Sequence, residues 1–390
     1  MQDVLICGSK RTPIGGFGGE LASMTAPELG AVAIQSALKD SEITASAVDE
    51  VFMGIVLPAG VGQAPARQAS LGAGLPQSVP CTAVSKVCGS GMQAVVQACA
   101  QIKSGQSTTI VAGGMESMSN APYLAPAMRH GARLGHGKMI DHMFFDGLED
   151  AYEAGTLMGV FAENCADRYV FSRAQQDEYA LASLSRSLEA QTLLAAEIAA
   201  VEVSTRKSDF RVQSDEQPRA ARPNKIPLLK PAFRKDGTVT AANASSISDG
   251  AAALVLASSS AVAASEATAR ARIVGYAGHA HEPGWFTTAP IGATQKLLNQ
   301  IGWSVNDVDL WEVNEAFAVV PMAFMQELEI PHHTINVFGG ACALGHPIGA
   351  SGARILVTLL NALEQRDLSR GVAAICIGGG EALSVAIERV

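Results

Sequence analysis

Positively charged side chains are scarce in this sequence. Lys and Arg together number 28 against 37 Asp and Glu, so the formal net charge is −9. Nucleic acids bind basic protein surfaces, and we therefore expect no nucleic-acid partner. Charged residues of both signs make up only 17% of the chain and hydrophobic residues 48%, which excludes a disordered protein. A chain of 390 residues with this composition predicts two or three compact units.

Long hydrophobic runs and targeting segments are also missing. No apolar stretch approaches the roughly 20 residues that a membrane-spanning helix needs. Residues 4–7 already have the composition of a strand, which leaves no room for a signal or transit peptide. Residues 387–390 match neither a retention signal nor a peroxisomal one. We therefore expect a cytoplasmic protein with no membrane partner.

Cysteines are few, and their spacing argues against two common uses. There are seven, an odd number, and no two of them form a CxxC pair. Zinc sites and disulfide frameworks need more regular spacings, so we expect reduced thiols and no metal site. One or two of these thiols are candidates for a reactive role.

The two ends of the sequence resemble each other. A helix-like stretch followed by VDEVFMG at 48–54 is matched by another followed by VDLWEVN at 308–314, and TIVAGG at 109–114 is matched by AAICIGG at 373–379. Asp49 aligns with Asp309, an offset of 260 residues (309 minus 49) that is far too long for a solenoid repeat. We infer two similar α/β domains, each with amphipathic helices layered on a mainly parallel sheet.

Residues 119–244 break this alternation and are interpreted as an insertion. They contain a capping box that starts at Ser172 and predicts a helix, followed by a basic, proline-punctuated stretch that includes Arg219. Residues 245–268 return to small apolar sequence. The predicted domains are a first half of residues 1–118 and 245–268, an inserted domain of residues 119–244, and a second half of residues 269–390.

Cys88 lies where a predicted strand turns through glycines into a helix, in VSKVCGSG at 84–91. Partial positive charge at a helix N-terminus lowers the pKa of a cysteine there and favours the nucleophilic thiolate. The glycines leave room for an acyl group and allow the backbone N–H of Cys88 to face its oxygen. The alternative is a cysteine that only packs in the core, as free cysteines commonly do. The turn favours a reactive cysteine but does not decide the matter alone.

His346 occupies the corresponding place in the second half, within GGACALGHPIGASG at 339–352. A histidine opposite Cys88 can take the thiol proton and later polarise a thioester oxygen. Taken alone, a structural histidine in a tight turn pinned by Pro347 is the commoner case.

Two further segments complete a possible site. Asn314 follows a predicted strand, where its side chain could hold a water molecule or an oxyanion. Cys376 ends a second strand and precedes three glycines, and a second cysteine near the first can act as an acid or base. For Cys376 alone, a buried small residue is the better interpretation.

These segments together resemble the thiolase family over essentially the full length of the chain. The matching stretches, in order and spacing, are VCGSG at 87–91, NASSISDGAAA at 243–253, NEAFA at 314–318, GGACALGHPIGASG at 339–352 and CIGGG at 376–380. The resemblance implies an α/β fold of two duplicated βαβαβαββ halves, layered α/β/α/β/α, with an inserted loop domain. It also implies a homo-oligomer, a dimer of dimers.

The resemblance implies a role for each candidate. Cys88 would accept the acyl group, His346 would activate it, and Cys376 would take the α-proton of a second acyl-CoA. His346 with a water held by Asn314 would form one oxyanion hole, and the N–H groups of Cys88 and Gly378 the other. Coenzyme A is then a substrate, and no metal or redox cofactor is needed.

The same resemblance implies a coenzyme A site on the inserted domain. Arg219 matches a position near the adenine and phosphates, and Ser245 one near the pantetheine arm. The other matched positions along the acyl and pantetheine path are Leu157, Met158, Phe286, Ala316 and Phe317. Charge counting alone favours a solvated surface for the stretch around Arg219.

The resemblance favours an acetyl-CoA C-acetyltransferase, which condenses two acetyl-CoA reversibly to acetoacetyl-CoA and coenzyme A. Short-chain members usually carry His-Met-Gly near the acyl pocket, whereas this chain has Leu157, Met158 and Gly159; Phe338 and Glu381 are further departures. The alternative is a 3-ketoacyl-CoA thiolase of broader chain length that acts in β-oxidation of fatty acids.

Two rival interpretations remain beside these. A decarboxylating ketoacyl synthase shares the duplicated fold but has a histidine at the place of Cys376. A non-catalytic acyl-CoA-binding protein would not need all four candidates, Cys88, Asn314, His346 and Cys376.

Overall fold

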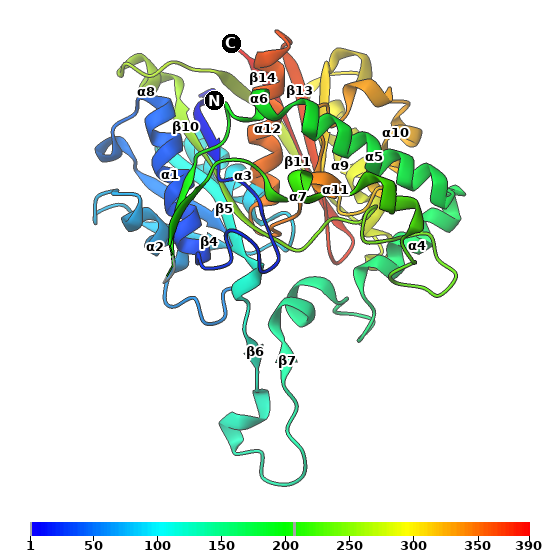
Figure 1. Ribbon diagram of the computed structural model, residues 1–390. Coiled ribbons are helices and arrows are strands. Elements are labelled where there is room, and N and C mark those ends of the chain that lie inside the picture. Colours follow the sequence, from blue (N-terminus) through cyan, green and yellow to red (C-terminus); the bar gives the residue numbers. More distant parts are fainter. Residues whose placement is uncertain (1, 206–207) are drawn as a thin grey trace.

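The computed structural model describes residues 2–205 and 208–390, and one ten-stranded sheet runs through it (Figure 1). Its strands are β1 (Val4–Arg11), β2 (Gly15–Gly16), β3 (Glu50–Gly54), β4 (Cys81–Val84), β5 (Thr109–Ser117), β10 (Ser248–Ser258), β11 (Ala271–Ala280), β12 (Leu310–Val313), β13 (Arg370–Ile377) and β14 (Glu381–Arg389). Their order is β12-β13-β14-β11-β1-β10-β5-β3-β4, with β2 beside β10.

The sheet consists of two matching halves that meet where β1 pairs with β11. In the first half the order from this seam is β1-β10-β5-β3-β4, and in the second it is β11-β14-β13-β12. In the first half, β4 lies beside β3. At the corresponding place beside β12 in the second half, Ile335 forms a single parallel bridge with Trp311. The duplication predicted from the sequence is therefore confirmed.

A pair of aspartates shows how closely the halves correspond. The Asp49 carboxylate accepts hydrogen bonds from the N–H groups of Thr108 (2.7 Å) and Thr109 (3.0 Å). The Asp309 carboxylate accepts from the N–H groups of Ser369 (3.0 Å) and Arg370 (2.8 Å). Each aspartate therefore ties the start of one strand to its neighbour at the same place in its half.

The prediction of a mainly parallel sheet is wrong. β3 is parallel to β4 and β5, and β12 is parallel to β13, but β10 is antiparallel to β1 and β5, and β14 is antiparallel to β11 and β13. The reason for β14 is local: only residues 378–380 separate it from β13, which is enough for a hairpin but too short for a parallel crossover.

Helices form three layers that alternate with the two halves of the sheet, as predicted. Two central helices, α3 (Ser90–Ser104) and α12 (Ser351–Gln365), contribute to one apolar cluster, which also includes residues from strands of both halves. The outer clusters contain α1 (Ala26–Ser41) and α2 (Pro65–Gly72) in the first half, and α9 (Ala289–Ile301) and α10 (Val319–Leu328) in the second. Burial of each leucine or isoleucine in these layers contributes about 1.5–3 kcal/mol.

The two central helices cross at their first turns through a pair of glycines. A Cβ atom on Gly91 would lie 2.9 Å from the Ala353 nitrogen, and one on Gly352 would lie 2.5 Å from the Met92 nitrogen. No side chain fits at either place, so each glycine lets the other helix approach. This crossing fixes the start of α3, which follows Cys88, relative to the start of α12, which follows His346.

The segment between β5 and β10 lies over the strand ends and includes a long arm, which projects from the rest of the molecule in Figure 1. The arm is built around β6 (Tyr123–Leu124) and β7 (Ile140–Asp141), which pair with each other. Beyond it come α4 (Met158–Tyr169), α5 (Arg173–Glu189), α6 (Gln191–Leu194), the hairpin of β8 (Val201–Ser204) and β9 (Asp209–Val212), and α7 (Glu216–Ala220). The capping box predicted at Ser172 is confirmed at the start of α5.

The remaining elements are short. They are α8 (Ser259–Ala263), α11 (Ala341–Leu344), and the helical turns η1 (Ala45–Ala47), η2 (Met118–Asn120), η3 (Pro126–His130), η4 (Phe144–Leu148), η5 (Pro223–Leu228), η6 (Pro283–Thr288), η7 (Val305–Asp307) and η8 (His332–Thr334). Among the helices of the described residues, none is long and apolar enough to cross a membrane.

Candidate active site

The turn that carries Cys88 is held by its own hydrogen bonds. Ser90, the first residue of α3, accepts a hydrogen bond from the Lys86 N–H (2.8 Å) and donates its hydroxyl proton to the Val87 carbonyl (2.7 Å). Val87 has a φ of 44°, a left-handed conformation that is costly for a β-branched residue. The turn thus holds Cys88 at the start of α3, as the sequence predicted.

The electrostatic setting of Cys88 differs from the prediction. Burial raises the pKa of the Cys88 thiol to about 11, although N–H groups of Gly378 and of Cys88 itself act in the opposite direction. The buried Glu116 carboxylate adds to the rise. A lowered pKa from the helix N-terminus was predicted; that prediction is wrong because the loss of solvent outweighs it. The thiol is therefore protonated at rest and needs a base.

The hydrogen bonds and burial of His346 set its tautomer and its charge. Its Nδ1 lies 2.5 Å from the Ser351 hydroxyl oxygen, and this hydroxyl lies 3.0 Å from the Pro347 carbonyl. The Ser351 hydroxyl has one proton to donate. When it donates this proton to the Pro347 carbonyl, its oxygen accepts a hydrogen bond from His346 Nδ1–H, and His346 Nε2 then carries no proton. Burial, with a smaller contribution from the Arg354 charge, lowers the pKa of His346 to about 3. His346 is thus neutral at physiological pH.

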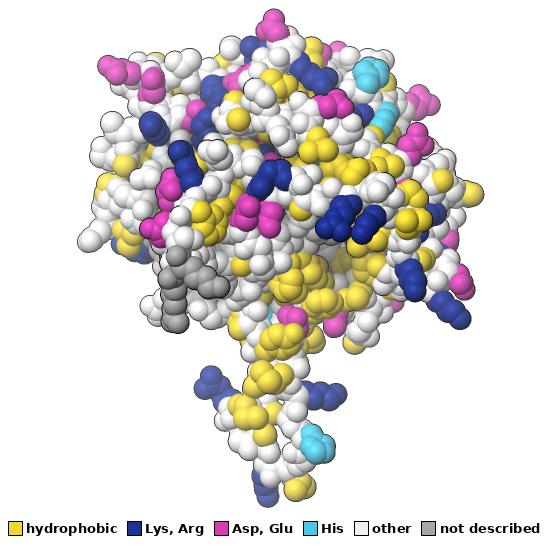
Figure 2. Space-filling model, in the orientation of Figure 1, with side chains coloured by type: hydrophobic (Ala, Val, Ile, Leu, Met, Phe, Trp, Pro, Cys, Tyr) yellow, Lys and Arg dark blue, Asp and Glu magenta, His cyan; other side chains and the backbone are white. Residues whose placement is uncertain are grey.

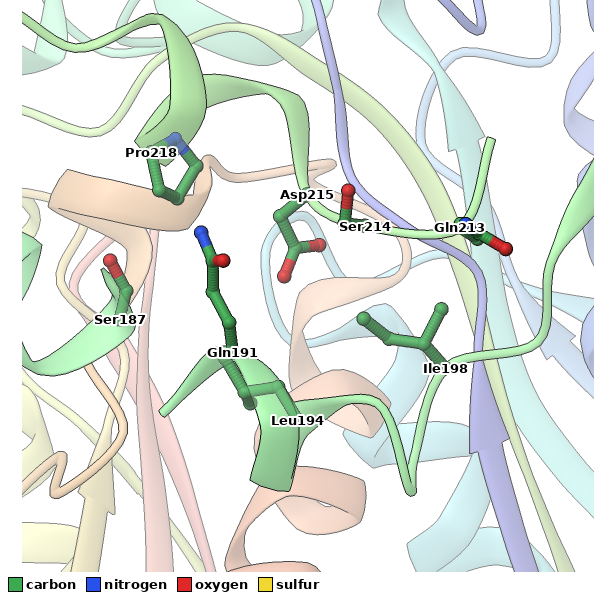
Figure 3. Close-up of a pocket in the computed structure, with 8 residues that line it drawn as sticks. All are labelled: Ser187, Gln191, Leu194, Ile198, Gln213, Ser214, Asp215 and Pro218. Atoms are coloured by element: carbon green, nitrogen blue, oxygen red, sulfur yellow. The ribbon is translucent and has the colours of Figure 1, made fainter. Parts of the chain in front are cut away.

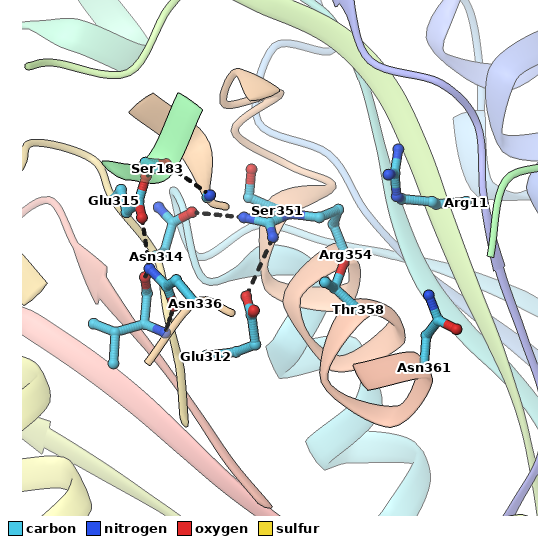
Figure 4. A network of polar contacts seen from close by, with 12 residues as sticks. Arg11, Ser183, Glu312, Asn314, Glu315, Asn336, Ser351, Arg354, Thr358 and Asn361 are labelled. Carbon is cyan, nitrogen blue, oxygen red and sulfur yellow. Dashed lines mark hydrogen bonds and ion pairs between the residues drawn. The ribbon is translucent and has the colours of Figure 1, made fainter. Parts of the chain in front are cut away.

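Two buried nitrogens in this region lack a protein partner. Neither His346 Nε2 nor Asn314 Nδ2 has a hydrogen-bond partner among the described residues. Buried polar atoms are costly to leave unpaired, so such atoms point to a ligand oxygen or water. On its other side, Asn314 accepts a long hydrogen bond from Arg354 (3.5 Å), which orients the amide (Figure 4).

Glu315, the residue after Asn314, holds the Asn314 loop in place through hydrogen bonds. The buried Glu315 carboxylate accepts hydrogen bonds from the Tyr179 hydroxyl (3.0 Å), the Ser183 hydroxyl (2.8 Å), the Asn336 amide (2.8 Å) and the Cys342 N–H (3.0 Å). Figure 4 shows Ser183 and Asn336 converging on this group. Glu315 therefore ties the Asn314 loop to α5 and to α11, which leads to His346.

Cys376 belongs to the same site as Cys88. It is fully buried in β13, one residue before the end of the strand. Burial raises the pKa of Cys376 above its ordinary value, and the neighbouring Cys88 thiolate raises it further. Because the Gly378 N–H acts on Cys88 as well, the structure brings Cys88, Cys376 and Gly378 together.

Apolar side chains surround this group, including most of those predicted to line the substrate path. A Cβ atom on Gly378 would lie 3.5 Å from Val87 and 3.7 Å from the Met158 methyl group. The preceding residue, Leu157, caps α4. Phe286 packs edge-on against Phe317 with ring centroids 6.3 Å apart.

The loop with Asn314 also contacts the segment that contains Ser245. The Ser245 N–H donates to the Ala316 carbonyl (2.9 Å), and Ala244 forms a bridge with Phe317. One residue further on, the Ser246 carbonyl accepts from the His346 N–H (3.1 Å). Ser245 thus lies between the two loops that carry Asn314 and His346.

Arg219 is not tied to this group by any contact within the described part of the chain. In α7 its guanidinium pairs with Glu20 (2.6 Å), so a phosphate would have to compete with this carboxylate. The neighbouring Asp215 pairs with the buried Arg11 (2.6 Å) and lines a small cavity of about 30 Å³ (Figure 3). A cavity of this size accommodates one or two water molecules and is too small for a nucleotide.

Three residues of the site were missed in the sequence. Glu116 accepts hydrogen bonds from the N–H groups of Val56 (2.9 Å), Leu57 (3.2 Å) and Gly349 (3.0 Å), and burial raises its pKa to about 7. Ser351 and Arg354 were missed as well. A single charged residue within an apolar strand or helix was the signal for Glu116 and Arg354.

Two residues that depart from the family pattern, Glu381 and Phe338, contact charged side chains in the structure. Glu381 forms an ion pair with Lys86 beside the Cys88 turn. Phe338 is buried beneath the Arg366 guanidinium, 5.8 Å from the ring centroid.

The duplicated fold thus carries a pair of neighbouring thiols and a buried histidine whose Nε2 has no partner among the described residues, groups that suit an α/β acyltransferase. Two family models match: "Thiolase, N-terminal domain" over residues 4–260 and "Thiolase, C-terminal domain" over residues 267–389. The chain belongs to the thiolase family.

Individual relatives support this over the full length. The chain is 46% identical over 393 residues to an acetyl-CoA acetyltransferase of Pseudomonas aeruginosa, and each chain is covered completely. The structure of the acetyl-CoA acetyltransferase of Bacillus anthracis superposes with a TM-score of 0.97 at 40% identity, covering 100% of this chain and 99% of the other. The Acat5 thiolase of Ascaris suum, solved with coenzyme A, gives 0.94 at 43% identity, with both chains fully covered.

Proposed function

We propose that this protein is an acetyl-CoA C-acetyltransferase that condenses two acetyl-CoA reversibly to acetoacetyl-CoA and coenzyme A. The observation that carries the proposal is the site itself: Cys88, Cys376 and Gly378 lie together, and the buried Nε2 of His346 has no partner in the part of the chain that the structure describes. The similarity to acetyl-CoA acetyltransferases over the full chain supports the same reaction.

In the first half-reaction, the Cys88 sulfur attacks the thioester carbon of acetyl-CoA. His346 Nε2 takes the thiol proton as the C–S bond forms and returns it to the departing coenzyme A thiolate. The N–H groups of Cys88 and Gly378 stabilise the oxyanion in this step, because both already point at the Cys88 sulfur.

In the second half-reaction, the Cys376 thiolate takes an α-proton from a second acetyl-CoA. The resulting carbanion attacks the acetyl carbon on Cys88 and the C–S bond breaks. The departing Cys88 thiolate then takes the proton from the Cys376 thiol, which restores both cysteines for the next turnover. The enolate oxygen accepts hydrogen bonds from a water held by Asn314 Nδ2 and from His346 in the tautomer that carries its proton on Nε2, with the Ser351 hydroxyl donating to Nδ1. No metal or redox cofactor takes part in this proposal, and coenzyme A is a substrate.

Coenzyme A extends in this proposal from the thiols toward the inserted segment. Ser245, Ala316 and Phe317 lie between the loops with Asn314 and His346 and would contact the pantetheine arm. Arg219 would exchange its bond with Glu20 for the nucleotide. Leu157, Met158 and Phe286 would border the acyl group.

Met158 is the residue that we expect to limit chain length, since its methyl group lies beside Gly378. Thiolysis of 3-ketoacyl-CoA substrates of graded length should fall steeply beyond the four- or five-carbon substrate. Met158→Ala should raise the relative rate with a six-carbon substrate about tenfold, because each methylene in a pocket changes the barrier by about 1–3 kcal/mol. Met322→Ala in α10, also packed on this apolar cluster, is the control.

A flat profile in the unmodified enzyme would favour the 3-ketoacyl-CoA thiolase of broader chain length, and no thiolysis at all would favour a protein that only binds acyl-CoA.

The arm around β6 and β7 supports a homotetramer, a dimer of dimers, within this proposal. Several of its apolar side chains are exposed, among them Tyr123 (62%), Met139 (71%) and Leu134 (97%). Figure 2 shows hydrophobic side chains along the arm and at its base. A second copy would cover them. Deletion of residues 125–139 should reduce the mass in light scattering to that of a dimer; an unchanged mass would exclude the arm as the contact.

A cytoplasmic location and a part in fatty acid metabolism belong to the same proposal. The seven cysteines are all free, in keeping with a reducing compartment.

A further inference from the structure

An open groove of about 470 Å³ lies along α5 and α6 and is distinct from the cavity of Figure 3, with which it shares no lining residue. It is lined by Arg186, Glu189, Ala190, Leu193, His333, Val337, Phe338 and Arg366. None of the proposed catalytic or coenzyme A residues is among them. Two of these side chains are guanidinium groups, and the third possible cation is an imidazole.

Neither arginine is neutralised by a carboxylate within 4 Å among the described residues. Arg186 donates to the carbonyls of Ile335 (2.9 Å) and His332 (2.9 Å), and its Nη2 also lies 3.4 Å from His332 Nδ1. Arg366 stacks on Phe338. The one carboxylate of the groove, Glu189, accepts from Ser185 (2.6 Å).

The two arginines also repel each other. Partial burial lowers the pKa of Arg366, and the Arg186 charge lowers it further. An anion between the two guanidinium groups would remove this repulsion. It would also accept from Arg366, whose side chain has no hydrogen-bond acceptor among the described residues, in the fork geometry that suits phosphate oxygens. We propose that this groove is a second anion-binding site, for a phosphate-bearing anion, and that its occupancy acts on the support of Asn314.

The second part of the proposal follows from the contacts of Arg186. Three residues before it in α5, Ser183 donates to Glu315, the neighbour of Asn314. The Ile335 carbonyl held by Arg186 precedes Asn336, whose amide bonds both Glu315 (2.8 Å) and the Val313 carbonyl (2.8 Å). An anion that draws Arg186 into the groove would loosen Ile335 and Asn336 and hence the placement of Asn314.

The test uses the full-length enzyme with pyrophosphate and with ADP as probes, titrated by calorimetry at low salt. Arg366→Gln removes one exposed guanidinium that stacks on the Phe338 ring and forms no side-chain hydrogen bond or ion pair within the described residues 2–205 and 208–390, so folding should be preserved. We expect pyrophosphate to bind the unmodified enzyme and to bind Arg366→Gln about tenfold more weakly, the loss of one charge-assisted contact. Lys39→Gln, which removes one charge at the end of α1, should bind as the unmodified enzyme does. If ADP binds tenfold more tightly than pyrophosphate, the ligand of the groove is a nucleotide. If the two probes bind with equal affinity, the ligand is a free phosphate group.

A kinetic measurement tests the coupling. Pyrophosphate should lower kcat for thiolysis without raising the KM for coenzyme A, and Arg366→Gln should abolish this effect. No binding of either probe, or binding that Arg366→Gln leaves unchanged, would overturn the site. A rise in KM alone would show competition at the coenzyme A site and would overturn the coupling. Binding of pyrophosphate is measured without turnover. A negative result for the groove can therefore be distinguished from a failure of the proposed acyltransferase reaction.

Discussion

Cys88→Ala should form no acetyl-enzyme and should lose about 10⁴ to 10⁶ of the thiolysis rate, the range found when a catalytic nucleophile is removed. The Cys88 sulfur is the atom that the Gly378 N–H faces, and in the proposed reaction the neutral His346 takes its proton. Intact-protein mass spectrometry after incubation with acetyl-CoA measures the adduct directly. Cys81→Ala, which alters a half-buried cysteine in β4, should keep both adduct and rate.

An acetyl adduct that persists in Cys88→Ala would contradict the assignment of the nucleophile. A variant that binds acetyl-CoA but never forms the adduct is the expected outcome, since the turn itself is held by Ser90 and not by the thiol.

Cys376→Ser should separate the two half-reactions. The serine hydroxyl is a far weaker acid than a thiol, so little alkoxide is available to take the α-proton, and condensation should fall about 10² to 10⁴, the usual contribution of a general base. The acetyl-enzyme should still form, because Cys88, His346 and both N–H donors are unchanged. The measurements are the mass adduct at Cys88 and the rate of acetoacetyl-CoA formation.

The control for Cys376→Ser is Cys165→Ser, which changes another buried thiol in the same apolar cluster. It tests whether a hydroxyl in this core reduces activity by misfolding alone. Condensation at the full rate in Cys376→Ser would exclude Cys376 as the base, whereas an equal loss in both variants would point to packing rather than to proton transfer.

The features that the sequence predicted are those with a local cause. The Cys88 turn follows from glycines at a strand-to-helix junction, and the helix predicted after it is α3. Asn314 could be placed because it follows a predicted strand, and His346 because the repeat gives it the place that corresponds to Cys88. The duplication was recognisable because Asp49 and Asp309 perform the same task at the same distance from their strands.

The features that the sequence did not predict depend on distant segments. The raised pKa of Cys88 comes from burial by both halves and from Glu116, none of which a turn motif contains. The donors to Glu315 come from α5, from Asn336 and from α11, which lie far apart in the chain. The partner of Arg219 was missed because Glu20 is 199 residues away.

The glycine crossing of α3 and α12 has a consequence for the history of such a chain. Once two copies of a half had become joined through Gly91 and Gly352, neither copy could change the first turn of its central helix alone, since any side chain there would strike the backbone of the other. The outer faces were under no such restraint, and an arm and an inserted segment could be added to one copy only. Substitutions and insertions are thus confined to the outer parts of the two halves. The Cys88 thiol of one half and the His346 imidazole of the other must be kept together.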